Sequence, residues 1–340
     1  MPTSLKTPLR REARAWVVAG RAEALARLEP LIEAHRARRP VRILGPEYAP
    51  SDLDDAAAAL VVGDPRLTPR RGLPGVFLRA SNGRLVPVGW LPDAGKRLET
   101  YAVAAAEVQR RRNAPATRGP FVFLNERDER AIAAVGQVTA AMPSRDRAFR
   151  WTSERISKLG LRCALQGGQG AAFYFGQGAA RGLAGYGVIS KSEVRTVRGY
   201  PLGVFLCLTC SVSSRPRRGL SFCEEAVLSG ICAASLGATG HTLHQGNVQL
   251  GLAFAQALHS PAISTLSALL LSSCVPVALL KKYRIVGDPL AKLVGHPDSL
   301  ERAERVFAPA PDGELPTIPF ARWGEEACDF SKSKSQTRNF

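Results

Sequence analysis

Residues 202–211 read LGVFLCLTCS, an apolar run that ends in a threonine, a cysteine and a serine. Residues 170–175, which read GAAFYF, and residues 232–236, which read CAASL, have the same continuous apolar character. Strands that are buried on both faces of a parallel sheet have sequences of this kind, whereas half-exposed strands alternate apolar and polar residues. We therefore expect these three stretches to be neighbouring central strands of one sheet.

Helical patterns follow the apolar stretches, at residues 222–228 and 247–258. Alternation of apolar strands with helices predicts a three-layer α/β/α sandwich on a mainly parallel sheet. Residues 65–93 are rich in proline and glycine and predict a loop region with one short strand. The same reasoning predicts strands at 41–44, 57–62, 76–78, 120–124 and 283–286, and helices at 14–38, 98–112, 128–141, 147–159 and 260–280.

These patterns divide the 340 residues into four expected parts. They are a basic amphipathic helix within residues 1–40, an N-terminal α/β subdomain at 41–145, a core at 146–295, and a C-terminal extension with a disordered tail at 296–340.

Composition excludes some classes of protein and suggests a class of partner. With 45% hydrophobic and 22% charged residues, the chain has enough apolar side chains for a core, so disorder throughout is excluded. Its 46 Lys and Arg residues exceed its 29 Asp and Glu residues, which gives a formal net charge of +17. Such a charge favours polyanionic partners, so nucleic acid or an acidic protein face is a possible partner.

Cysteine usage and hydropathy suggest a compartment. The seven cysteines are not arranged as a dense disulfide framework, and no apolar run of the signal-peptide kind follows the basic N-terminus. We therefore expect a cytoplasmic protein with free thiols. Residues 260–280 carry no charge and could just span a bilayer, but they include several Ser and Thr residues and Pro276. We expect a buried core helix there and no contact with a membrane.

The ends of the three central strands carry the candidate chemistry. The first strand leads into Gly176-Gln177-Gly178, the second into Cys210-Ser211, and the third into a loop with His241. Sites in parallel α/β sheets gather beyond the carboxyl ends of the strands. We therefore expect Gln177, Cys210 and His241 to meet in one crevice.

Several segments in order resemble the gingipain-like cysteine peptidases, which have the caspase–haemoglobinase fold. The resemblance covers about residues 165–293, and more loosely 57–125, and it implies a caspase-like core at 146–295. In that family, an apolar strand ends in His-Gly, the next strand ends in the nucleophilic cysteine, and a Gly-Asp-Pro follows a later strand. The matching segments are YFGQG at 174–178, GLAGYG at 182–187, FLCLTCS at 205–211, SFCEEAVLSGICAASLGAT at 221–239 and YRIVGDPL at 283–290.

The chain departs from this pattern at one important position. The resemblance places Cys210 at the nucleophile and Gln177 at the catalytic histidine. Cysteine proteolysis uses an imidazole to activate the thiol and to protonate the leaving amine. A glutamine amide cannot accept a proton near neutral pH. The resemblance therefore implies a pseudo-peptidase that binds a peptide or a protein.

Two alternatives remain open. His241 or His244 could serve as the base for Cys210, which would make the chain an active endopeptidase. In the other alternative, the Arg-rich N-terminal helix makes the chain a basic scaffold for nucleic acid or an acidic partner. We expect no metal and no cofactor, because Cys207 and Cys210 lie three residues apart and would face opposite sides of a strand.

A peptide in the crevice would meet the residues around the thiol. The expected contacts are Gly176, Gly178, Ser211 and Arg215. The arginine would favour an acidic side chain.

Overall fold

The computed structural model describes residues 14–63, 75–112, 118–143, 148–195, 199–216 and 219–307. The tail expected toward residue 340 therefore lies outside the described residues. The beginning of the C-terminal extension is a helix, α11 (Ser299–Phe307).

Within the described residues, eleven strands form one sheet. Its order is β2-β1-β3-β5-β14-β13-β12-β8-β6-β7, and β4 pairs with β5 outside this path. Three more short strands, β9, β10 and β11, form a separate small sheet. The bounds are β1 Ala15–Ala19, β2 Val41–Leu44, β3 Ala56–Gly63, β4 Phe77–Arg79, β5 Leu85–Pro92, β6 Phe121–Asn125, β7 Ala148–Arg150, β8 Ala171–Phe175, β9 Gly178–Ala179, β10 Gly182–Leu183, β11 Ile189–Ser190, β12 Leu202–Leu208, β13 Cys232–Ala238 and β14 Tyr283–Gly287.

The large sheet consists of two parallel halves that run in opposite directions. Strands β2, β1, β3, β5 and β14 are parallel to one another, and so are β13, β12, β8, β6 and β7. The halves meet at the antiparallel pair β13–β14. The mainly parallel sheet was predicted correctly, and this reversal was not part of the prediction. It means that the carboxyl ends of the two halves lie at opposite edges of the sheet.

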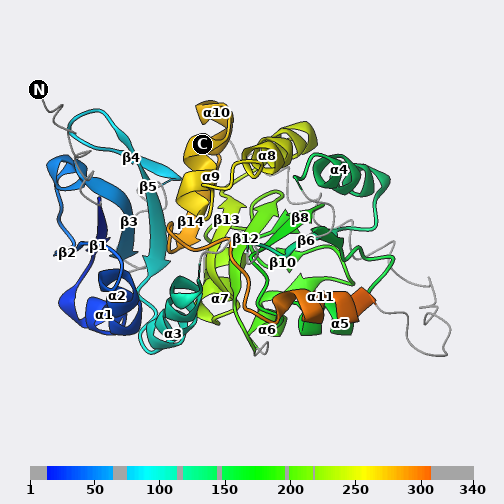
Figure 1. Ribbon diagram of the computed structural model, residues 1–340, viewed down its shortest axis with the longest axis horizontal. Coiled ribbons are helices and arrows are strands. Elements are labelled where there is room, and N and C mark those ends of the chain that lie inside the picture. The colour runs from blue at the N-terminus through cyan, green and yellow to red at the C-terminus, as the bar shows by residue number, and fades with distance from the viewer. Residues whose placement is uncertain are drawn as a thin grey trace, which may run out of the picture. The chain divides into compact units, whose positions relative to one another are not determined.

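Helices cover both faces of the sheet (Figure 1). On one face, α3 and α7 pack on β13, and α2 packs on α3. On the other face, α4 packs on β6 and β8, while α8 packs on β12 and contacts α9. This arrangement is the expected three-layer α/β/α sandwich. The bounds of the helices are α1 Ala22–Ala26, α2 Glu29–Arg36, η1 Pro50–Leu53, α3 Arg97–Arg110, α4 Glu129–Ala140, α5 Lys158–Ala164, α6 Lys191–Val194, α7 Phe222–Leu228, α8 His244–Ala257, α9 Leu266–Ser272 and α10 Val277–Leu280.

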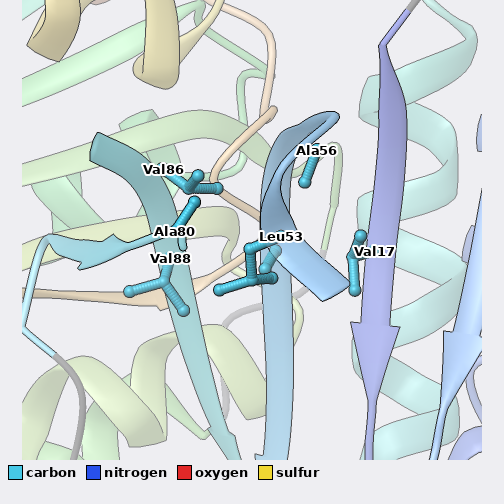
Figure 2. Packing of buried hydrophobic residues seen from close by; sticks show 7 residues of the cluster. Val17, Leu53, Ala56, Ala80, Val86 and Val88 are labelled. Atoms are coloured by element: carbon cyan, nitrogen blue, oxygen red, sulfur yellow. The ribbon is translucent and has the colours of Figure 1, made fainter. Parts of the chain in front are cut away.

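Small apolar side chains fill the space beside the N-terminal half of the sheet. Val17 of β1 and Val86 and Val88 of β5 belong to this cluster, together with Leu53 from η1 (Figure 2). Ala56 and Ala59 of β3 lie between them. Because the strand residues are alanine and valine, η1 can lie close to the strands.

The predicted helix over residues 14–38 is wrong in its first part. Residues Ala15–Ala19 form β1, which is buried along its whole length between β2 and β3. The sequence AWVVA has the aromatic and β-branched residues that favour strands, and a short apolar run does not by itself separate helix from strand. Two short helices, α1 and α2, follow. The Arg-rich amphipathic helix on which the scaffold alternative depended is therefore absent as a single element from the described residues 14–38.

Two other helix predictions are also wrong. Residues 147–159 contain the edge strand β7 rather than a helix, because Ala148–Arg150 pair with β6. Residues 260–280 form two short helices, α9 and α10, separated by a segment that ends in Pro276. Proline disfavours helical backbone in the residue before it and cannot continue the preceding helix. Leu271 and Val277 are 54% and 50% exposed, so this region is not a fully buried core helix.

The sequence also missed β5, which lies in the proline- and glycine-rich region and is central to the sheet. Within the described residues, no helix is long and apolar enough to cross a membrane. Strands from residues 41–145 and from residues 146–295 belong to the same sheet, and the division at these boundaries stays a prediction.

Candidate functional site

The three central strands are neighbours and run in the same direction, as predicted. In register, Cys207 of β12 lies beside Tyr174 of β8 and Gly237 of β13. The carboxyl ends of β8, β12 and β13 therefore share one edge of the sheet. Their following segments carry Gln177, Cys210 and His241.

The segment after β8 packs directly against the segment after β12. The Thr209 hydroxyl donates a hydrogen bond to the Gly176 carbonyl at 2.6 Å. A Cβ atom at Gly178 would lie 2.7 Å from the side chains of Thr209 and Val212, so only glycine fits at this position. These contacts place Gln177 and Cys210 on the same rim of the sheet.

The backbone of Gln177 is held on both sides. Its N–H donates to the Glu126 carboxylate at 2.7 Å, and its carbonyl accepts from the Tyr174 hydroxyl and the Ala184 N–H, both at 3.0 Å. Its side chain is exposed. Since the backbone of Gln177 is fixed by bonds that do not involve its side chain, another side chain would be presented from the same position.

The Cys210 thiol is half-buried and contacts the loop after β13. Its Sγ atom lies 3.4 Å from the Thr242 carbonyl oxygen and 3.5 Å from the Thr242 hydroxyl, and the Thr242 N–H donates to it at 3.4 Å. The adjacent Ser211 N–H donates to the Gly240 carbonyl at 3.0 Å. The loop after β13 therefore fixes both the thiol and the residue that follows it.

Neither candidate histidine is hydrogen-bonded to the thiol. His241 and His244 are both exposed, and His244 is the first residue of α8. Among the described residues, the hydrogen-bond partner of Cys210 Sγ is Thr242, and no imidazole nitrogen bonds to it. The two histidines lie on the loop and helix that follow β13, and neither of them forms a hydrogen bond with the Cys210 thiol.

The predicted peptide contacts lie on this same rim. Ser211 has a left-handed backbone with φ of +54°, which is uncommon for a residue other than glycine and is often found at functional sites. Arg215 is half-buried in the loop after Cys210. The pKa of the Arg284 guanidinium is lowered mainly by burial and further by the charge of Arg215. Arg284 donates to the Ser213 carbonyl at 3.2 Å. The loop after the thiol therefore carries one guanidinium group, that of Arg215, and bonds to a second, that of buried Arg284.

Two residues of the site, Glu126 and Thr242, were not predicted from the sequence. Glu126 follows β6 at the same edge of the sheet, and its carboxylate is partly buried, which raises its pKa. Its position after an apolar strand was a signal of the same kind that identified Cys210. Thr242 directly follows His241, and only its contact with the thiol reveals its role.

The other thiols near the site are buried. Cys207 lies within β12, and its Sγ atom is 4.0 Å from the Ser235 hydroxyl. Burial raises the pKa of the Cys207 and Cys232 thiols well above the ordinary value. A nucleophile must be accessible as a thiolate. Around this edge of the sheet, Cys210 is therefore the thiol that a peptide could reach.

The fold and this edge define a class of protein, the caspase-like α/β sandwiches in which a thiol lies at the end of a central strand. Comparison with known families agrees with that class. The profile of Peptidase family C25, the gingipain family, matches residues 98–294, which is more than half of the chain. The chain belongs to this family.

Solved structures show the same fold at low sequence identity. The Arg-specific cysteine proteinase gingipain R (RgpB) has a TM-score of 0.62 and 11% identity, over 84% of this chain and 80% of that one. The complex of the Porphyromonas gingivalis RgpB pro- and mature domains gives a TM-score of 0.60 and 12% identity, over 83% and 79%. A structure described as a protease gives 0.60 and 10%, over 82% and 78%. No curated protein sequence matches the chain.

Proposed function

We propose that this chain is a catalytically impaired member of the gingipain family that binds a peptide segment in the crevice beside Cys210. In this proposal, Cys210 has the nucleophile position and Gln177 has the position of the catalytic base. The observation that carries the proposal is the surroundings of the thiol. Cys210 Sγ bonds to Thr242, and the residue presented from the neighbouring strand end is an amide.

Chemistry supports impairment rather than a changed mechanism. A thiol attacks a peptide carbonyl as its thiolate, and the leaving amine must then receive a proton. A positioned imidazole does both, and general acid–base catalysis of this kind contributes about 10²- to 10⁴-fold. The Gln177 amide can donate a hydrogen bond to a bound carbonyl but cannot move a proton.

The surroundings of the thiol also favour one kind of peptide. Arg215 lies half-buried in the loop that follows Cys210, and Arg284 donates to a carbonyl of that loop. Charge-assisted hydrogen bonds from guanidinium groups favour carboxylates. We therefore expect the bound segment to carry an aspartate or a glutamate close to the residue that contacts the thiol.

The alternative is an active endopeptidase in which His241 or His244 is the base. A loop movement would have to carry one of these exposed side chains to the thiol, since catalytic pairs work at hydrogen-bond distance and can be looser before substrate binds. The experiment below separates this alternative from the proposal.

A gain of activity tests the proposal directly. The wild type, Gln177→His and Gln177→Asn are incubated with a peptide library that is rich in acidic residues, and cleavage is followed by mass spectrometry. We expect no cleavage by the wild type or by Gln177→Asn, and cleavage by Gln177→His at least about 100-fold above background, because the fixed backbone would present an imidazole beside the thiol. The added substitution Cys210→Ala should abolish it.

Two results would contradict the proposal. Cleavage by the wild type that is lost in Cys210→Ala and in His241→Ala or His244→Ala would establish the active alternative. Failure of the wild type and of Cys210→Ala to bind any acidic peptide in a fluorescence-anisotropy assay would remove the binding role.

A further inference from the structure

A second charged region lies at the opposite edge of the sheet, where the ends of α2 and α3 meet. A pocket of about 310 Å³ opens there, lined by Glu33, Ala34, Ala37, Arg38 and Arg110. We propose that this pocket binds a small polyanion that carries phosphate groups. The proposal is independent of the function proposed for the Cys210 crevice.

The pocket is separate from the Cys210 site. Lys292, which belongs to the same charged region, follows β14, and its carbonyl packs against Gly203 at the beginning of β12. Cys210 lies beyond the other end of β12. Cys210 is seven residues after Gly203. At about 3.3 Å per residue of extended chain, the Lys292 backbone beside Gly203 lies roughly 23 Å from Cys210.

Five cationic residues lie close together in this region. Arg38 donates to the carbonyls of Arg110 and Arg111, each at 3.4 Å, and the Lys292 ammonium donates to the Arg111 carbonyl. The charges of Arg38, Arg39 and Arg111 act together on Lys292. The pocket therefore opens beside a cluster of Arg38, Arg39, Arg110, Arg111 and Lys292.

Carboxylates balance only one of these charges. Glu107 pairs with Arg111, and Glu33 at the pocket pairs with Arg36, which lies outside the cluster. Asp288 acts on Arg39 at longer range, but its carboxylate hydrogen-bonds to His35 and Gln109. Among the described residues, no carboxylate forms an ion pair with Arg38, Arg39, Arg110 or Lys292.

Several donors in the cluster also lack acceptors. The Arg39 Nε atom is buried and has no hydrogen-bond partner within the described chain. The Lys292 side chain is almost completely buried, and its ammonium group, which has three hydrogens to donate, has one acceptor among the described residues, the Arg111 carbonyl. Buried donors without acceptors cost free energy. An anion in the pocket would contact Arg38 and Arg110 directly, and the charge of Arg38 also acts on Lys292.

The capping of helix ends explains only part of this arrangement. Basic side chains are favourable near helix C-termini, and one Arg38 nitrogen bonds to the last carbonyls of α3. Capping does not require half-buried Arg39 to act on buried Lys292. Burial, and further the charges of Arg38, Arg39 and Arg111, lower the pKa of Lys292 to about 7.

Phosphate is the anion that fits these groups best. Guanidinium groups bind phosphate oxygens in pairs, and an ammonium group binds phosphate as a point charge. A volume of about 310 Å³ is at the small end of the range for ligand pockets. The pocket is therefore suited to a compact ligand with two or more phosphates rather than to an extended nucleic-acid backbone.

Calorimetry with inorganic tripolyphosphate tests the proposal at pH 7 and constant ionic strength. We expect saturable 1:1 binding by the full chain. Arg110→Ala should weaken it by about tenfold or more, because a charge-assisted hydrogen bond contributes more than the free energy of one factor of ten. Arg110 is exposed and its guanidinium has no partner among the described residues, so folding should be unaffected. A second variant, Arg38→Ala, should weaken binding in the same way.

The matched control is Arg130→Ala, which removes an exposed arginine from α4. It should leave the affinity unchanged. The proposal is overturned if the wild type does not bind, if Arg110→Ala and Arg38→Ala bind as the wild type does, or if Arg130→Ala weakens binding equally. Tighter binding of a single-stranded RNA that Arg110→Ala abolishes would assign the surface to nucleic acid and would also overturn it.

Discussion

At the scale of single residues, the candidate site separates what the backbone fixes from what the side chain supplies. Gln177 is held through its N–H by Glu126 and through its carbonyl by Tyr174 and Ala184. Cys210 is held through its thiol by Thr242. The backbone at position 177 is therefore held independently of the side chain that it carries, which is why exchange of this side chain is an informative test.

The reactivity of Cys210 should not depend on either nearby histidine. Because no imidazole nitrogen bonds to the thiol, we expect His241→Ala and His244→Ala to alkylate at Cys210 within about twofold of the wild-type rate, whereas a paired imidazole accelerates a thiol strongly. Iodoacetamide labelling followed by mass spectrometry of the Cys210 peptide measures this. Exposed Cys274 serves as the internal reference.

A drop of tenfold or more at Cys210 alone, with labelling of Cys274 unchanged, would show that one histidine reaches the thiol in solution. That result would favour the active-enzyme alternative. Gln177→His provides the positive comparison, since we expect it to label faster than the wild type.

The strand ends that carry Gln177 and Cys210 could be predicted because buried parallel strands have a distinctive apolar sequence and end at one edge. Glu126 and Thr242 could not be identified in the same way. Their roles depend on contacts with residues 51 and 32 positions away in the chain. No local pattern encodes such contacts.

At the scale of elements, errors occur where a short segment is decided by its neighbours. The run AWVVA at 15–19 is buried between two strands, and Ala148–Arg150 pairs with β6 at the edge of the sheet. Both segments are too short for periodicity to distinguish helix from strand. Strand β5 was missed because its Pro and Gly residues resemble a loop, although the structure uses Gly89 for a close approach to β14.

That close approach makes a prediction about β5. A Cβ atom at Gly89 would overlap the Gly287 carbonyl oxygen and lie 2.9 Å from Pro289 Cδ. We expect Gly89→Ala to lower the free energy of unfolding by about 2–3 kcal/mol, as overpacking in a tight core does. Chemical denaturation measures this change.

The same substitution at Gly136 is the control. Gly136 lies inside α4, and an added Cβ atom would meet nothing within 4 Å. Alanine is favoured over glycine in a helix, so Gly136→Ala should raise the free energy of unfolding by about 0.5–1 kcal/mol. Equal effects of the two substitutions would mean that the β5–β14 contact is not as close in solution.

At the scale of the whole molecule, the antiparallel pair β13–β14 separates two sets of strand ends. The half that contains β8, β12 and β13 presents its carboxyl ends at the Cys210 edge. The half that contains β14 and β5 presents its carboxyl ends at the opposite edge, where Lys292 is buried among arginines. The alternation of strands and helices predicts the layers, but it does not specify strand direction across the sheet, so the second edge could not be anticipated.

Burial of Lys292 should appear in the pH dependence of global stability. Its pKa is lowered from 10.5 to about 7 in the folded chain, chiefly by burial and further by Arg38, Arg39 and Arg111. Between these two values, the unfolded chain holds a proton on this side chain that the folded chain has released. Stability rises with pH wherever the unfolded state binds more protons, so this lysine makes folding more favourable as pH increases from about 7 toward 10.

The contribution of Lys292 is isolated by the difference between the wild type and Lys292→Met, because the other titrating groups are common to both. Methionine fills similar space without a charge, so we expect the wild type to gain stability relative to Lys292→Met as pH increases across this window. Lys281→Met, which changes an exposed lysine, should show a constant difference from the wild type. Urea denaturation at half-unit pH steps gives both differences. If the difference for Lys292→Met is flat, the ammonium group is solvated in the folded chain.

If tripolyphosphate binds at the pocket, its presence should flatten the same difference at neutral pH, because a bound anion would favour the charged lysine.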